Sequence, residues 1–167
     1  MRKHKIICVI IVLFALSGCG SIDAGVLNYA DHAFYADVEG MLNGLDFTAR
    51  VQVGAPSEDN ARSINIQFSS PESLDGIVVA RDADGTTVSL DGVVITDAAA
   101  QGWLAVAHAL IPAGQVVNIK KEEGNAAVAT VALDSKQTIV IDLNTGAPLE
   151  ATLDGVNVRV IRFEYTE

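Results

Sequence analysis

Few residues of this sequence combine a reactive side chain with the spacing that chemistry requires. After residue 18 there are two histidines, His32 and His108, and neither has a second ligand at His-x-x-x-His or His-Glu-x-x-His spacing. His108 falls in an apolar stretch, which favours a packed histidine over a catalytic one. The acidic loop that begins at Asp82 lacks the glycine and glutamate positions of an EF-hand calcium loop. The sequence therefore predicts no catalytic residue, no metal site and no cofactor.

Cys19 has the clearest chemistry, which is acylation of its thiol. A positive N-terminus, with three basic residues among its first five, precedes an apolar run from Ile6 to Leu16. That run is too short to cross a bilayer and has the length of a signal-peptide core. The segment Leu16-Ser17-Gly18-Cys19 resembles the bacterial lipobox, in which the chain is cut before the cysteine and the sulfur carries lipid. The resemblance implies a lipid anchor in the cell membrane or outer membrane, facing outside the cytoplasm.

Composition and charge predict one acidic domain behind this anchor. The chain has a net charge of −10 and is 50% hydrophobic. A leader of residues 1–18 would remove three of the eleven basic residues and none of the 21 acidic ones. Such a domain repels nucleic acid and anionic lipid headgroups, so membrane attachment must be apolar or covalent. We predict a signal peptide at 1–18, a lipidated N-terminus and tether at 19–32, and a folded domain at 33–167.

Alternation of polar and apolar residues predicts a mainly β domain with an antiparallel sheet. Asn-Gly and Asp-Gly pairs supply its turns. In the last strand the apolar phase changes at Val160-Ile161, which predicts a bulge or sharp bend. Arg159 and Arg162 on that strand are candidates for an edge or partner contact. The predicted strands are Phe34–Met41, Asp46–Val53, Arg62–Ser69, Ile77–Arg81, Thr86–Leu90, Val93–Ile95, Gln115–Lys121, Ala126–Leu133, Thr138–Leu143 and Val156–Tyr165.

One clear helix interrupts the strands. Thr96 or Asp97 is a candidate N-cap, a run of alanines follows, and Pro112 ends the helix. Between these limits the helix is apolar nearly all round, so it must be covered on more than one side. A second, short helix is expected at Val26–His32. We therefore expect an α+β fold, in which a strongly curved sheet forms an unclosed half-barrel around one or two helices.

Several short stretches also suggest a family. Ile66, Phe68 and Pro71 lead into a Leu-Asp-Gly turn, and Thr145-Gly146-Ala147-Pro148 precedes the final strand with Arg162, Phe163 and Tyr165. With the lipobox and the alternating strands, this arrangement resembles the LolA/LolB-like superfamily of lipoprotein-localisation factors, which includes GerS-type lipoproteins of Gram-positive bacteria. The resemblance implies a non-enzymatic half-barrel with helices on its concave side. Members of the superfamily hold acyl chains there or bind a protein partner.

Apolar residues of the strands and the helix are candidates for lining a concave binding surface, although ordinary core between helix and sheet is the favoured interpretation. The candidates are Phe34, Phe47, Val51, Ile64, Phe68, Trp103, Ala107 and Leu110. Three functional hypotheses stay open. The first is a module that binds a hydrophobic ligand, such as a lipid or a lipoprotein acyl chain. The second is a scaffold that recruits an envelope protein, for example a cell-wall hydrolase or a germination factor. The third, an envelope hydrolase that uses His108, lacks a recognisable constellation, and we expect no enzyme.

Overall fold

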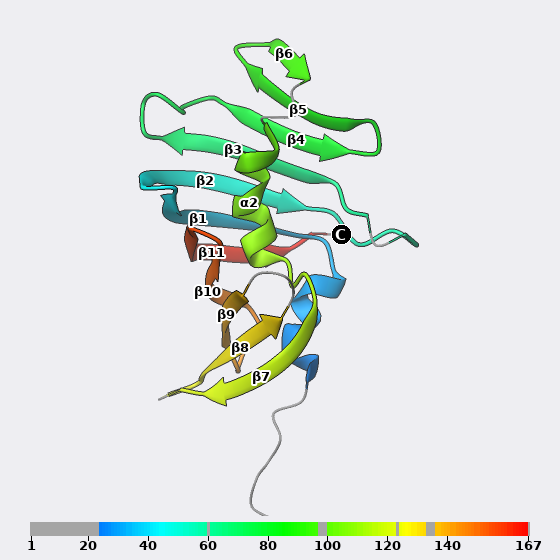
Figure 1. The fold of residues 1–167 in the computed structure, drawn as a ribbon, viewed down its shortest axis with the longest axis vertical. Coiled ribbons are helices and arrows are strands. Elements are labelled where there is room, and N and C mark those ends of the chain that lie inside the picture. Colours follow the sequence, from blue (N-terminus) through cyan, green and yellow to red (C-terminus); the bar gives the residue numbers. More distant parts are fainter. Residues whose placement is uncertain (1–23, 60, 97–99, 123, 133–135, 167) are drawn as a thin grey trace, which may run out of the picture.

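A computed structural model describes residues 24–59, 61–96, 100–122, 124–132 and 136–166, and these form a mainly β domain (Figure 1). Its helices are the 3-10 helix η1 (Ala24–Asp31) and the α-helix α2 (Gln101–Leu110). The strands are β1 (Phe34–Leu42), β2 (Leu45–Val53), β3 (Ile64–Ser70), β4 (Val78–Asp82), β5 (Gly85–Leu90), β6 (Val93–Thr96), β7 (Gln115–Lys121), β8 (Ala126–Ala132), β9 (Lys136–Asp142), β10 (Pro148–Leu153) and β11 (Val156–Tyr165).

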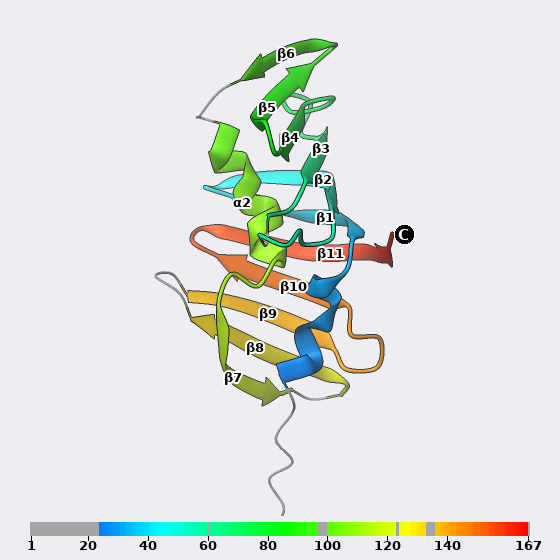
Figure 2. The ribbon, with the colours of Figure 1, turned by 90° about the vertical axis from the view of Figure 1, so that its right-hand side faces the viewer.

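All eleven strands belong to one antiparallel sheet, in the order β6-β5-β4-β3-β2-β1-β11-β10-β9-β8-β7. The sheet is not closed, because β6 and β7 each have a single neighbour. It curves around α2, which runs across one face (Figure 2). The chain therefore builds two successive runs of neighbouring strands, β1–β6 and β7–β11, and joins them where β1 pairs with β11.

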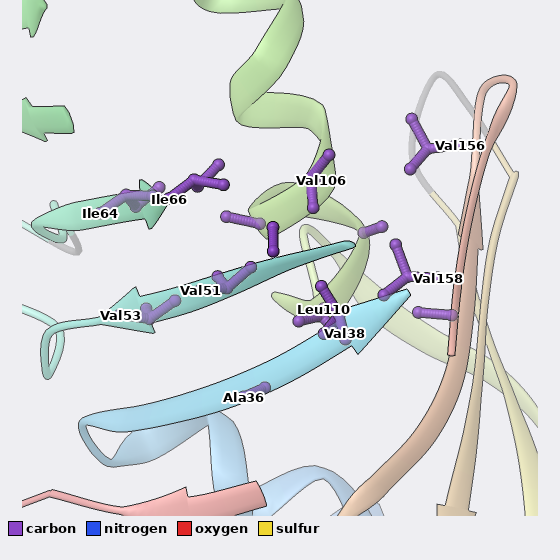
Figure 3. Packing of buried hydrophobic residues seen from close by; sticks show 14 of the residues in the cluster. Ala36, Val38, Val51, Val53, Ile64, Ile66, Val106, Leu110, Val156 and Val158 are labelled. Atoms are coloured by element: carbon purple, nitrogen blue, oxygen red, sulfur yellow. The ribbon is translucent and has the colours of Figure 1, made fainter. Parts of the chain in front are cut away.

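The alternation in the sequence decides which face of each strand is buried. In β2 the side chains of Phe47, Ala49, Val51 and Val53 are buried, whereas most of the residues between them are exposed. Figure 3 shows Val38, Val51 and Ile66 of the sheet on the side that faces α2, near Val106 and Leu110 of the helix. The buried face of α2 and the concave face of the sheet thus form one hydrophobic core.

Two sequence predictions about local structure are confirmed. The phase change in the last strand is a bulge: Asp37 pairs with Arg162 and Val38 with Val160, which leaves Ile161 without a partner residue. The short helix expected near Val26–His32 is present as η1, and it buries Leu27 and Tyr29.

Other predictions were wrong. Strand β10 was missed, because no strand was predicted between Leu143 and Val156. Thr96 ends β6 and does not cap α2; Ala100 occupies the N-cap position, and Asp97 lies outside the described residues. Arg159 and Arg162 are not at an edge, because β11 lies in the middle of the sheet.

Among the described residues, no helix has the length and apolar character that crossing a bilayer requires.

Candidate functional site

The apolar residues predicted to line a concavity lie in the core between α2 and the sheet. Seven of them are at most 4% exposed, and Trp103 is partly buried against them. Phe47 meets Phe68 with ring centroids 5.8 Å apart, and Phe68 meets Trp103 at 5.2 Å, both edge to face. Such packing fills the concave side beneath α2 with protein side chains. The set that the structure buries with Trp103 is Phe34, Phe47, Val51, Ile64, Phe68, Ala107 and Leu110.

The C-terminal end of α2 is fixed by two buried side chains from other elements. The Gln137 amide nitrogen, on β9, donates hydrogen bonds to the carbonyl oxygens of His108, Ala109 and Ile111. The Tyr29 hydroxyl, from η1, donates to the carbonyl oxygen of Leu110. These donors satisfy carbonyls that a helix end leaves without intrahelical partners. Burial raises the pKa of Tyr29 far above its ordinary value, so the hydroxyl keeps its proton. The helix is therefore held against the sheet at this end.

At the other end of α2 the concave face is open. A continuous row of paired residues crosses the sheet from Val51 through Ile66, Val79 and Val88 to Ile95. The first three are fully buried, Val88 is partly buried, and Ile95 is 56% exposed. The apolar inner face thus continues past the part that α2 covers, and it ends on β5 and β6 without a cover among the described residues.

A groove of about 680 Å³ runs between α2 and this end of the sheet. Its lining is mostly polar and includes Arg81 and Thr86 from the strands and Gln101 and His108 from the helix. A guanidinium nitrogen of Arg81 lies 3.5 Å from Nε2 of His108. Burial, followed by the charge of Arg81, lowers the pKa of His108, so the ring is neutral at pH 7 and accepts from the guanidinium. A polar groove of this kind does not match an acyl chain.

The β5–β6 hairpin carries a run of three consecutive exposed apolar residues, with a fourth beside it. Val93, Val94 and Ile95 are 64%, 63% and 56% exposed, and Leu90 beside them is 45% exposed. A strand at Val93–Ile95 is predicted from the sequence, but these residues are not among the predicted site residues. The sequence feature that could have identified them is three consecutive apolar β-branched residues immediately after the Asp91-Gly92 turn. No polar residue among them indicates a solvent-exposed face. We define Leu90, Val93, Val94 and Ile95 as the hairpin patch.

The convex face over β1, β2 and β11 is polar and ion-paired. Arg50 binds Asp37 through two hydrogen bonds of 2.7 and 3.0 Å, which lower the pKa of that carboxyl. Arg159 pairs with Glu39 and Arg162 with Glu164. The described residues contain no group of three or more His, Cys, Asp or Glu side chains that could hold a metal ion. The convex face therefore carries solvated, mutually neutralised charge.

Comparison with known proteins gives structural likeness only. No family model matches the chain, and no curated protein does. An uncharacterised conserved protein from Thermus thermophilus is similar over 84% of this chain and 83% of that one, with a TM-score of 0.52 and 16% identity. This likeness shows a shared fold.

Two further solved structures match with lower scores. MucB of Pseudomonas aeruginosa, solved in complex with MucA, gives a TM-score of 0.44 and 20% identity over 86% of this chain, which spans 56% of the MucB chain. A LolA superfamily protein from Nitrosomonas europaea gives a TM-score of 0.39 and 12% identity over 86% of this chain and 76% of that one.

Proposed function

We propose that the protein is a non-enzymatic binding protein, anchored outside the cytoplasm through lipid on Cys19, that recruits an envelope protein. One observation carries the choice of a protein partner. The space beneath α2 is filled by the core, whereas the hairpin patch exposes Leu90, Val93 and Ile95 on the inner face of the sheet and Val94 on its outer face, all at one edge. Apolar side chains gathered in one exposed place mark an interaction site more often than scattered ones do.

The anchor is supported by the residues before the domain. The Leu16-Ser17-Gly18-Cys19 motif follows a basic and then apolar segment, and the net charge of −10 leaves an anionic membrane no electrostatic attraction. Metabolic labelling with a fatty-acid probe tests it. Labelling should disappear in Cys19→Ala and persist in Cys8→Ala, whose cysteine lies inside the predicted leader. Equal labelling of the two variants would remove the anchor from the proposal.

The partner is tested by purification of the lipidated chain from membranes after crosslinking. The wild-type chain should enrich one protein at least tenfold over a triple variant, Val93→Thr with Val94→Thr and Ile95→Thr. Val117→Thr is the matched control, because Val117 is 60% exposed on the other edge strand. It should enrich the same protein as the wild type. Enrichment that is identical in the triple variant would exclude the hairpin patch.

A hydrophobic ligand is the second candidate, and the uncovered end of the apolar inner row favours it. Native mass spectrometry of the gently extracted protein distinguishes the two. If one lipid per chain is bound noncovalently and is lost in Ile95→Asn, the ligand is a lipid and the proposal of a protein partner is wrong. If the mass equals that of the acylated chain alone, the hydrophobic-ligand hypothesis is wrong and the recruitment of a protein partner remains the proposed function.

A further inference from the structure

The two open edges of the sheet differ in how they are protected. Strand β7 carries Lys120 and Lys121, and its pairing with β8 shifts register between Val116 and Asn118. Charged residues and bulges of this kind discourage another strand from adding to an edge. Strand β6 has neither, since its sequence Val-Val-Ile-Thr is uncharged and it pairs with β5 in unbroken register. Within the described residues neither edge has a further strand beside it, and β6 is the one of the two able to accept another.

The backbone of β6 has a defined set of groups directed at the open edge. Asp91 and Gly92 form a two-residue hairpin loop, with φ of 50° and 80°. The flanking pair, Leu90 and Val93, is then the hydrogen-bonded pair of the hairpin, and the next pair, Ser89 and Val94, is not. The N–H and C=O of Val94 therefore point away from β5, where an added strand would meet them.

The side chains of β6 are apolar on both faces of the sheet. Val93 and Ile95 pair with Leu90 and Val88 and so share their inner face. Val94 projects from the opposite, outer face. An added strand would therefore place its alternate side chains against Val93 and Ile95 on one face and against Val94 on the other. The geometry suits an extended segment with apolar residues on both sides.

A second copy of this chain fits the β6 edge poorly. Stable protein interfaces use about 20 to 30 residues a side, whereas β6 contributes four. Each copy also carries a net charge of −10, so two copies repel each other. A flexible segment of a different protein, neutral or basic in charge, avoids both obstacles.

We infer that β6 is a docking strand that binds an extended, neutral or basic, apolar-rich segment of a protein partner by adding it to the sheet as a twelfth strand. This inference rests on the proposed function and specifies its contact. Main-chain hydrogen bonds to Val94 hold the segment, and the side chains of the hairpin patch select apolar residues.

The test uses the full acylated chain in detergent micelles and a ten-residue probe peptide of alternating valine and isoleucine with a lysine at each end. Binding is followed by fluorescence anisotropy, and edge pairing by amide hydrogen exchange at Val94. The peptide should slow exchange at Val94 at least tenfold. Val94→Pro should weaken binding at least tenfold, because it removes the outward N–H, while Val94→Thr should bind within about threefold of the wild type.

N-methylated peptides provide a test that needs no variant protein. Methylation of every second amide leaves one edge of the peptide able to pair with β6 and should preserve binding, whereas methylation of every amide blocks both edges and should abolish it. Equal binding of these two peptides would overturn the inference. So would unchanged exchange at Val94 at saturating peptide, or sedimentation showing a dimer that Val94→Pro dissociates.

The two proposals fail separately. If crosslinking enriches a partner equally well with wild type and Val94→Pro, the recruiting function stands and strand addition is wrong. If the peptide protects Val94 but no membrane protein is enriched by the wild-type chain, the edge accepts strands and the recruiting function is wrong.

Discussion

The hydroxyl of Tyr29 lies 2.5 Å from the carbonyl oxygen of Leu110 and donates a hydrogen bond to it, which joins η1 to the last turn of α2. Tyr29 also packs edge to face on Phe34 and on Phe163, with ring centroids 5.8 Å from each. Through Tyr29, η1 is thereby bound to the same helix that packs on the concave side of the sheet.

Tyr29→Phe should therefore destabilise the fold with little change in packing. The ring stays, but the buried carbonyl of Leu110 loses its donor, which costs about 1 to 3 kcal/mol. Urea denaturation measures the loss. Tyr165→Phe is the control, because that ring is 52% exposed, and it should change stability by less than about 0.5 kcal/mol. Equal stability of the two variants would contradict the role of the hydroxyl.

Gln137→Leu should be costly although leucine has a similar volume. The Gln137 amide serves three carbonyl oxygens, and its own oxygen accepts from the Ala113 N–H at 3.2 Å. Leaving these groups unpaired in a buried place should cost about 2 to 3 kcal/mol. Gln115→Leu, at an exposed position of β7, should be neutral within about 0.5 kcal/mol. Thermal melts of both variants decide the point.

Two glycines should respond to alanine in opposite directions. A Cβ at Gly40 on β1 would collide with the carbonyl oxygen of Asn157 and lie 3.1 Å from the ring of Phe47, so Gly40→Ala should cost about 1 to 3 kcal/mol. A Cβ at Gly102 on α2 meets nothing within 4 Å. Gly102→Ala should stabilise the helix by about 1 kcal/mol. Changes of the same sign would contradict the packing described for β1.

Stability should fall on the acidic side of neutrality because of His108. Its pKa is lowered in the folded state by burial and by Arg81, so the unfolded chain binds the proton more tightly. The contribution of neutral His108 to the unfolding free energy is complete above about pH 6.5, which is the pKa of histidine in the unfolded chain. It is lost as the pH falls below that pKa. His108→Gln should remove this decline in urea titrations, and Arg81→Gln should make it shallower. A slope unchanged in His108→Gln would refute the assignment.

The sequence predicted those elements whose period is uninterrupted, and it located the bulge at Ile161 because two regular phases meet there. Strand β10 was not predicted, because its pairing with β9 shifts between Pro148 and Glu150 and this shift breaks the alternation that identifies a strand. Whether Phe68 or Ile95 faces solvent could not be predicted. Both are apolar residues of the concave face, and their burial depends on how far α2 extends along the sheet.

The centre of the sheet joins the two ends of the chain, since β1 pairs with β11 and Glu39 meets Arg159, 120 positions later. During synthesis from the N-terminus, β1 can pair with β2, but its other edge stays open until β11 has been made. Closing so long a loop is slow on entropic grounds, so folding should be completed only after β11 has emerged. A truncation that removes β11 would therefore remove the middle of the architecture instead of trimming its border.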